Sequence, residues 1–354
     1  MEVFAQVPDP RDPRGVRHGL ATLLTLAQTA VLAGARTLLA IAEWTQDADR
    51  DTLSRIGIPA DQVLPSESTM RRTLALLDAD DLDARLAGWM STRVGHLAGR
   101  RVIAVDGKTM RGARTTAGAP HLVAALDHSA GAVLGQLAVA SKSNEIPALR
   151  DLLDNMDITD AVVSADAMHC QRETAIHITD RGGHYVLTVK ANQPTLRAAC
   201  KALPWKDVPA RTTSDRSHGR RVRRTIKAVQ APDWIEFPAA AQIIQLRRTR
   251  TIKGRKTIEV VYAICSLDMI AAPPATVATW IQGHWAIESL HWVRDVVFDE
   301  DRHQLRTGNG PQVMATLRNT AISLLRLAGH TKIATALRHH GRLINRPIDL
   351  LLSA

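Results

Sequence analysis

The stretch from Arg101 to Lys190 alternates between short apolar runs and amphipathic stretches, and this order limits the fold more than any other feature. The runs RVIAVDG, HLVAALD and AVLGQLAVA are separated by turn residues, which is typical of three strands in succession. Helical spacing over 146–156 follows, then the strand-like AVVSAD, a helix over about 173–180 and the strand-like HYVLTVK. This order predicts an α/β fold with a mixed sheet and helices on its faces.

The flanking regions have other patterns and predict further domains. Residues 20–97 repeat apolar side chains at helical spacing, and the chain becomes helical again from Pro274. Residues 201–275 instead carry short strand-like runs, among them VRRTIKAV, AAQIIQL and IEVVYAIC, punctuated by prolines. We therefore expect a helical N-terminal domain at 1–97, a ribonuclease-H-like core at 98–200 and 276–330, an inserted strand-rich subdomain at 201–275, and a C-terminal tail at 331–354.

Positive charge is concentrated in the predicted insertion. The chain holds 45 Lys and Arg against 35 Asp and Glu, and Arg211 to Lys256 alone contains 13 of the cations and 3 of the acids. Two clusters hold most of these cations: Arg216, Arg220, Arg221, Arg223, Arg224 and Lys227, then Arg247, Arg248, Arg250, Lys253, Arg255 and Lys256. The clusters predict a local footprint for the phosphate backbone of DNA, with a solvated basic face as the alternative. Only 7 Trp, 3 Phe and 2 Tyr are present, which argues against single-strand binding by stacking.

Other classes of protein are disfavoured. The start, MEVFAQVPDPRDPRG, lacks the order of a signal peptide. The uncharged stretch from Leu20 to Ala35 is shorter than the roughly 20 apolar residues that span a bilayer, so no membrane partner is expected. Cys170, Cys200 and Cys265 lie far apart, which disfavours a disulfide framework and a structural zinc site and suits the cytoplasm.

Three acids fall where predicted elements end or pack. Asp106 lies at the end of the first predicted strand, Asp166 ends the fourth, and Glu288 lies inside the predicted helix HWAIESLHW. Carboxylates that converge at a sheet edge offer the hard oxygen ligands that suit Mg²⁺ or Mn²⁺. The alternatives are a turn residue for the first acid, a helix N-cap for the second and a solvated helix face for the third. Glu288 shares one predicted helical stripe with His284, His291 and Asp295.

Other catalytic motifs fit less well. Gly107-Lys108-Thr109 resembles the end of a phosphate loop, but Val102 stands where the first glycine of that motif belongs. The histidines around Glu288 lack the H-E-x-x-H spacing of zinc proteases. His169-Cys170 has no recognisable thiol-protease context.

The N-terminal region offers one candidate reader of DNA. Ser66 is a predicted N-cap for a helix that carries Arg71 and Arg72. A helix, a break and a short helix that opens with Ser66, Thr69, Arg71 and Arg72 could form a helix-turn-helix. An ordinary helical bundle with a solvated arginine pair is the alternative.

A series of longer motifs resembles one family nearly from end to end. The motifs are DPRDPRGVRHGL, PSESTMRRTLALLD, IAVDGKTMRGAR, HLVAALDHSAGAVLGQ, KSNEIPAL, VVSADAMHCQRETA, GGHYVLTVKANQPTL and HWAIESLHWVRDVVFDED. In this order they resemble the insertion-sequence DDE transposases of the H-repeat-associated, ISAs-type branch. The resemblance implies a ribonuclease-H-like core that cleaves transposon ends and joins 3′-hydroxyls to target DNA.

The resemblance also implies a site and its partners. Asp106, Asp166 and Glu288 fall on the DDE triad, which would bind two Mg²⁺ or Mn²⁺ ions. Double-stranded DNA is the implied partner, as terminal inverted repeats and as target, with a homodimer on DNA and a nucleoid-associated protein in a bacterial cytoplasm. The chain departs from the family pattern at Ile281, Gln282, His284, Ser289 and Asp295. Candidate phosphate contacts beside the metals are Lys108, Arg111, Lys190, Asn192 and Arg302.

Two other functions remain open at this point. A transposase-derived protein could bind DNA without catalysis, and Gln282 and Ser289 leave room for this alternative. A ribonuclease-H-like repair or recombination nuclease would share the core chemistry, but it would not explain the series of motifs.

Overall fold

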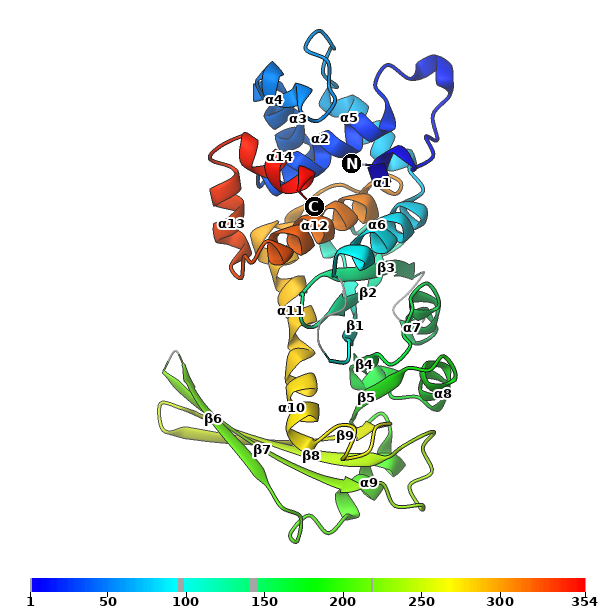
Figure 1. Ribbon diagram of the computed structural model, residues 1–354, viewed down its shortest axis with the longest axis vertical. Helices are drawn as coiled ribbons and strands as arrows, with labels where there is room; N and C mark the ends of the chain where they lie inside the picture. Colours follow the sequence, from blue (N-terminus) through cyan, green and yellow to red (C-terminus); the bar gives the residue numbers. More distant parts are fainter. Residues whose placement is uncertain (1, 95–98, 140–144, 218, 354) are drawn as a thin grey trace. The chain divides into compact units, whose positions relative to one another are not determined.

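The computed structural model describes residues 2–94, 99–139, 145–217 and 219–353 (Figure 1). Their contacts divide the chain into two compact units. The first unit contains Met1–Leu97, Gly107–Ala148 and Ala286–Ala354, and the second contains Ala98–Asp106 and Leu149–Trp285. The predicted domain boundary at 97/98 and the first residues of KSNEIPAL lie outside the described residues. The domain limits predicted from the sequence stay predictions.

The first unit is mainly helical. Its N-terminal helices are α1 (Glu2–Ala5), α2 (Leu20–Leu32), α3 (Leu38–Asp47), α4 (Arg50–Ser54), α5 (Glu67–Leu76) and α6 (Ala79–Val94). Its C-terminal elements are α11 (Trp285–Trp292, from Ala286), the turns η5 (Val293–Val297) and η6 (Glu300–Arg302), and α12 (Gly310–Leu327), α13 (Ile333–His340) and α14 (Asn345–Leu352). The apolar helix α2 is buried over most of its length and packs against α12, so the helix that the apolar spacing from Leu20 predicts is confirmed. No helix within the described ranges is long and apolar enough to cross a membrane.

Two antiparallel strands, β2 (His121–Asp127) and β3 (Val133–Val139), complete the first unit, with the end of β1 (Val102–Thr109) and the turn η2 (Arg111–Ala113). Every residue of β2 is buried, and helix α6 packs against β3. The pairing shifts register between Ala125 and Leu126, where β2 has an irregularity of the bulge type.

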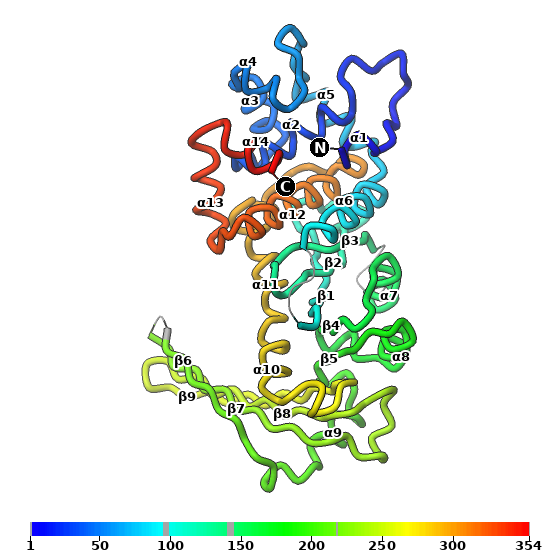
Figure 2. The backbone as a smooth tube through the Cα atoms, in the orientation of Figure 1, coloured from blue at the N-terminus to red at the C-terminus, as the bar shows by residue number. Residues whose placement is uncertain are grey.

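The second unit is built on a mixed sheet. The start of β1 pairs in parallel with β4 (Val162–Ala165), and β4 pairs in parallel with β5 (His184–Val189). The sheet continues through antiparallel strands in the order β9 (Arg255–Cys265), β8 (Gln242–Ile252), β7 (Arg220–Gln230) and β6 (Arg211–Ser217). Figure 2 shows the hairpins β6–β7 and β8–β9 lying side by side. Helices of this unit are α7 (Glu145–Asp154, from Leu149), α8 (Arg172–Asp180), α9 (Pro194–Ala202) and α10 (Pro274–Gly283), with the turn η4 (Ala167–His169).

One apolar core runs through this sheet. Val102, Val162 and Val186 of the parallel strands belong to the same buried cluster as Ile244 of β8 and Val277 of α10. The cluster joins the strands predicted for the core to the strand-rich segment 201–275. The predicted order of three strands, helix, strand, helix and strand is confirmed, because the apolar spacing of each run matches its element.

The helix predicted through Glu288 differs from a uniform α-helix. α10 ends at Gly283, α11 begins at Trp285, and Val293–Val297 forms a π turn in which Phe298 N–H donates to Val293 O at 3.1 Å. A π turn bonds residue i to i+5 and shifts the phase of the side chains that follow it. Asp295 lies in this turn, so the predicted stripe of α-helical spacing does not extend to it.

Candidate active site

Asp106 and Asp166 lie at neighbouring positions of the second unit. β1 and β4 pair in parallel from Val102↔Val162 to Val105↔Ala165, and each aspartate directly follows the last pair. Asp106 is still within β1 and is not a turn residue, while Asp166 has extended backbone angles of φ −69° and ψ 167° at the start of η4. Neighbouring strands are about 4.8 Å apart, so the two carboxyl groups begin from adjacent points at one edge of the sheet.

The residues that follow β5 hold the Asp166 segment. Lys190 Nζ lies 2.9 Å from Asp166 Oδ1, and Asn192 Nδ2 donates to Ala167 O at 2.6 Å. Burial raises the pKa of Asp166, but the hydrogen bond and charge of Lys190 outweigh burial, so its pKa is lowered overall. The carboxylate is therefore ionised, half-exposed and paired with Lys190.

His284 contacts the same strand from the end of α10. Its Nδ1 lies 3.1 Å from the Oγ of Ser164, two residues before Asp166 in β4. The pKa of His284 is lowered to about 4, chiefly by burial; Asp166 raises it, and His169 and Lys190 lower it. The imidazole is thus neutral at pH 7 and adds no positive charge beside Asp166. The sequence pattern placed His284 on a helical stripe with Glu288 and among the departures from the family pattern, but it did not predict the contact with Ser164.

The third acid of the predicted triad lies in the first unit. Glu288 is exposed on α11, between the buried Ile287 and Leu290. Among the residues that the structure describes, no group of three His, Cys, Asp or Glu side chains is close enough to hold a metal ion. The joint role of Asp106, Asp166 and Glu288 stays a prediction.

In the first unit, the end of β1 contacts a buried series of hydrogen-bonded polar side chains that the sequence pattern did not predict. A Cβ at Gly107 would lie 2.5 Å from Glu145 Oε1, so only glycine lets the Glu145 carboxyl approach this backbone. Glu145 Oε2 is 2.7 Å from His121 Nε2, and His121 Nδ1 is 2.9 Å from Thr109 Oγ1. The signal in the sequence was the glycine after Asp106.

The predicted phosphate contacts of the first unit differ in exposure. Lys108 is 7% exposed, and its ammonium forms an ion pair with Asp295, which the π turn carries. Arg111 and Arg302 are 75% and 85% exposed, and each lies more than 3.5 Å from its acidic neighbour. Lys108 is thus a buried, paired cation, whereas Arg111 and Arg302 are open to a ligand.

Ser66 is predicted to cap the second helix of the candidate helix-turn-helix, and the structure confirms this cap. The Oγ of Ser66 accepts a hydrogen bond from Thr69 N–H at 3.3 Å and caps α5. Arg71 forms an ion pair with Glu67 one turn earlier, and Arg72 Nε donates to Ser68 O at 3.2 Å. The helix-turn-helix itself stays a prediction.

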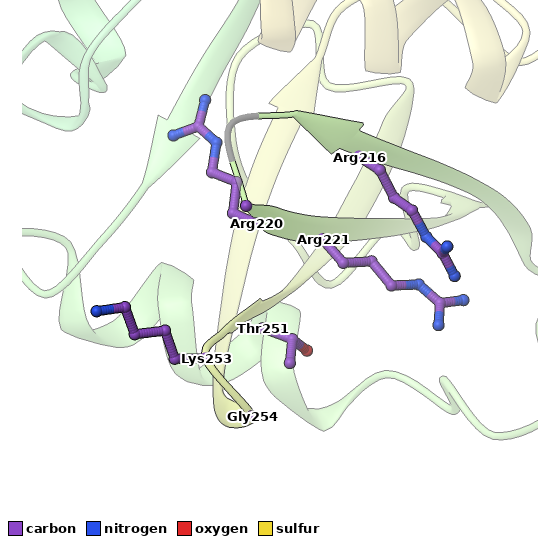
Figure 3. Close-up of a pocket in the computed structure, with 7 residues that line it drawn as sticks. Arg216, Arg220, Arg221, Thr251, Lys253 and Gly254 are labelled. Carbon is purple, nitrogen blue, oxygen red and sulfur yellow. The ribbon is translucent and has the colours of Figure 1, made fainter.

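The two basic clusters lie on the outer halves of four antiparallel strands. We name residues 211–216, 220–225, 247–252 and 255–260 the basic ribbon, from β6, β7, β8 and β9. At its tip, a cleft of about 410 Å³ is lined by Arg216, Gly219, Arg220, Arg221, Thr251, Lys253 and Gly254 (Figure 3). Arg248 pairs with Glu259 at 2.5 Å, and its guanidinium lies 4.9 Å from the ring centre of Trp285. Charge patterning alone located the ribbon, but not the direction of its side chains.

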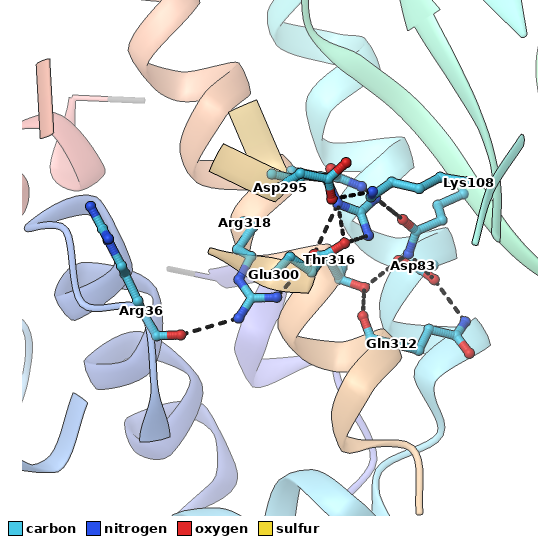
Figure 4. A network of polar contacts seen from close by, with 11 residues as sticks. Arg36, Asp83, Lys108, Asp295, Glu300, Gln312, Thr316 and Arg318 are labelled. Atoms are coloured by element: carbon cyan, nitrogen blue, oxygen red, sulfur yellow. Dashed lines mark hydrogen bonds and ion pairs between the residues drawn. The ribbon is translucent and has the colours of Figure 1, made fainter. Parts of the chain in front are cut away.

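The first unit also contains a buried network of arginines. Arg294 and Arg318, each 1% exposed, both bond to Glu300, which is 2% exposed, at 2.8–3.1 Å (Figure 4). We name these three residues the arginine–glutamate network. Burial raises the pKa of Glu300, but the two guanidinium charges outweigh burial and lower it to about 2. Gln136 accepts from Arg294 and donates to Asp83, linking the network to a second buried carboxyl.

Comparisons with known proteins give the family. Residues 97–324 match the family described as "Transposase DDE domain", and residues 1–90 match "DDE_Tnp_1-associated". "Putative transposase YncI" of Escherichia coli O157:H7 is 31% identical over 349 residues, 92% of this chain and 87% of that protein. "H repeat-associated putative transposase YhhI" of Escherichia coli strain K12 is 31% identical over 345 residues, 92% of this chain and 89% of that protein.

A solved structure of a piggyBac transposase synaptic complex with hairpin DNA has a TM-score of 0.45 and 10% identity, covering 100% of this chain and 77% of that chain. This likeness is too weak to establish a shared fold. The family match and the two relatives confirm the resemblance that the sequence motifs predicted. The chain belongs to the DDE transposases, in the branch of the H-repeat-associated proteins.

Proposed function

We propose that the protein is an active transposase with a ribonuclease-H-like core, which cleaves DNA at transposon ends and transfers the 3′-hydroxyls to target DNA. The observation that carries this proposal is the pair Asp106 and Asp166, which directly follow the last paired residues of two adjacent parallel strands, inside the segment that matches the transposase DDE domain. Carboxylates in adjacent positions can supply the oxygen ligands of a two-metal site that cleaves phosphodiesters.

The donor chemistry of these residues fits Mg²⁺ or Mn²⁺. Carboxylate oxygens are hard ligands, and Lys190 keeps the Asp166 carboxylate ionised. We propose that Asp106 and Asp166 hold two ions and that Glu288 completes the set. When bound, such ions lower the pKa of an attacking water or hydroxyl and neutralise charge on the departing oxygen. The neutral His284 beside Asp166 does not compete for the carboxylate as a cation would.

The proposed partner is double-stranded DNA, as terminal inverted repeats and as target, bound by a homodimer in the bacterial cytoplasm. The exposed cations of the basic ribbon, with Arg111 and Arg302, supply charge for phosphate contacts. Lys108 fits this role less well, because Asp295 already compensates its charge in a buried position.

The test of this proposal separates cleavage from binding. Asp106→Asn and Glu288→Gln should each abolish Mg²⁺-dependent cleavage of the DNA ends that flank the gene, because each removes a proposed metal ligand, while duplex binding is retained. Glu173→Gln, at an exposed acid in the first turn of α8, serves as the control and should cleave normally. Normal cleavage by both site variants would refute the triad. Duplex binding without cleavage by the unaltered protein would instead indicate a DNA-binding protein that has lost catalysis.

A further inference from the structure

The basic ribbon has two faces, and the strand register assigns each cation to one of them. Residues paired across antiparallel strands project to the same face, and successive residues of one strand alternate between faces. The pairs Arg216↔Arg221, Arg221↔Thr251 and Thr251↔Lys256 set one row, and Arg223↔Thr249 and Thr225↔Arg247 continue it inward. We name this side the open face; it carries Arg216, Arg221, Arg223, Arg247 and Lys256.

The opposite side, which we name the helix face, carries Arg211, Arg220, Arg224, Arg248, Arg250 and Arg255. Figure 3 shows the separation at the tip, where Arg216, Arg221 and Thr251 project to one side and Arg220 to the other.

Helix α10 packs against the inward continuation of the helix face, and two acids offset part of its positive charge. On the same face of β7 and β8, beyond the ribbon and away from its tip, Ile226 and Ile244 pack in one core with Val277 of α10. Both acids of the ribbon stand on this face, since Asp215 pairs with Val222 and Glu259 pairs with Arg248 in register.

Three helix-face arginines, Arg224, Arg248 and Arg250, are also partly buried. Half of the cations on this face are therefore partly covered, and its two acids reduce its net positive charge.

The open face differs in each of these respects. All five of its cations are exposed, and none of its positions in the ribbon holds an acid. The next open-face residue inward, Tyr262, is buried with its ring 6.0 Å from that of Trp205, so the face ends there. The open positions between the tip and Tyr262 hold no aromatic side chain that could stack on bases.

We propose that duplex DNA lies against the open face, with Arg216, Arg221, Arg223, Arg247 and Lys256 contacting its phosphates; this rests on the proposed function in DNA transposition. Same-face residues of one strand are about 6.8 Å apart and adjacent strands about 4.8 Å apart, so the cations form a two-dimensional array and not a single line. Such an array, without acids and without aromatic rings, matches the sequence-independent backbone of a duplex.

The test compares two double variants on the same strand, with equal loss of charge. Arg221→Gln with Arg223→Gln changes the open face, and Arg220→Gln with Arg224→Gln changes the helix face. Binding to a 30-base-pair duplex of arbitrary sequence is measured by fluorescence anisotropy between 50 and 200 mM salt. Each lost phosphate contact lowers the salt slope by about 0.9, so the open-face variant should lose about 1.8 and the helix-face variant far less. Arg221→Lys with Arg223→Lys retains the charge and should keep the slope.

Each outcome decides one of the two proposals. If the unaltered protein does not bind the duplex, the proposed function itself fails. If it binds but the helix-face variant loses as much slope as the open-face variant, only the assignment of the face is wrong. The assignment is also overturned if the open-face variant weakens binding to a single strand of the same length more than binding to the duplex. Thermal unfolding followed by circular dichroism confirms that each variant is folded.

Discussion

Arginine has opposite surroundings in the two units of this molecule. Arg294 and Arg318 of the arginine–glutamate network are 1% exposed and share one carboxylate, that of Glu300. Arg221 and Arg223 of the basic ribbon are exposed; the register partners of Arg221 are Arg216 and Thr251, and those of Arg223 are a serine and a threonine. A buried guanidinium needs an anion beside it, because isolated charge is costly to remove from water. A surface arginine without an acid is instead available to a phosphate.

The same comparison holds for the acids linked to the network. Burial raises the pKa of both Glu300 and Asp83, but Glu300 has two cations beside it and its pKa falls to about 2. Asp83 accepts hydrogen bonds from neutral groups, namely the side chains of Gln136, Gln312 and Thr316, and its pKa rises to about 7. The nature of the partner, more than the depth of burial, decides which form of the carboxyl is stable.

The largest expected effect comes from breaking the network. Glu300→Gln leaves two buried guanidinium groups without an anion and should lower the free energy of unfolding by about 3–5 kcal/mol. Glu259→Gln is the matched control, because Glu259 is 53% exposed and pairs with Arg248 on the ribbon. Its loss should amount to less than about 1 kcal/mol. Urea unfolding followed by circular dichroism measures both values. Equal losses would mean that burial does not distinguish the two regions.

A second expected effect depends on pH. The folded pKa of Asp83 is about 7, above its ordinary value of 3.8, so the folded protein retains a proton that the unfolded chain has already lost between these values. The contribution to stability is fully present below pH 4 and is lost as the pH rises to about 7, by up to a few kcal/mol. Asp83→Asn should flatten the decline in unfolding free energy between pH 5 and 7. An unchanged slope in this variant would show that Asp83 does not carry the titration.

Much of the fold could be predicted because it depends on local pattern. The apolar runs ending at Asp106 and Asp166 have the length and spacing of buried strands, and the structure has β1 and β4 there. The N-cap at Ser66 follows from a short polar side chain before a helical stretch. The π turn at Val293–Val297 could not be predicted, because one extra residue in a turn leaves the composition and the apolar pattern almost unchanged.

The rest of the candidate site depends on contacts that a linear pattern does not contain. Lys108 and Asp295 are 187 residues apart, so no local pattern shows their ion pair, and in the sequence Lys108 is a candidate phosphate contact. The ion pairs of Glu300 with Arg294 and Arg318 are likewise not visible in the sequence pattern. In the ribbon, composition located the positive charge, but the faces of Arg220 and Arg221 follow only from the register with β6 and β8. Glu288 is assigned to the predicted triad from the family pattern and not from a contact.

The smallest expected effect has the opposite sign to the first. Arg216 and Arg221 stand directly opposite each other on β6 and β7, and like charges in such a pair destabilise a sheet by about 0.2–1 kcal/mol. Arg221→Gln should therefore raise the free energy of unfolding slightly at 20 mM salt, and the gain should vanish at 500 mM because salt screens exposed charges. Urea unfolding at the two salt concentrations measures the difference, with Arg223→Gln as the control, since Arg223 faces Ser214 on β6 and Thr249 on β8. A loss of stability in Arg221→Gln would mean that Arg221 has a stabilising partner in the fold, as Arg294 and Arg318 do. It would contradict the view that Arg221 is available to bind DNA.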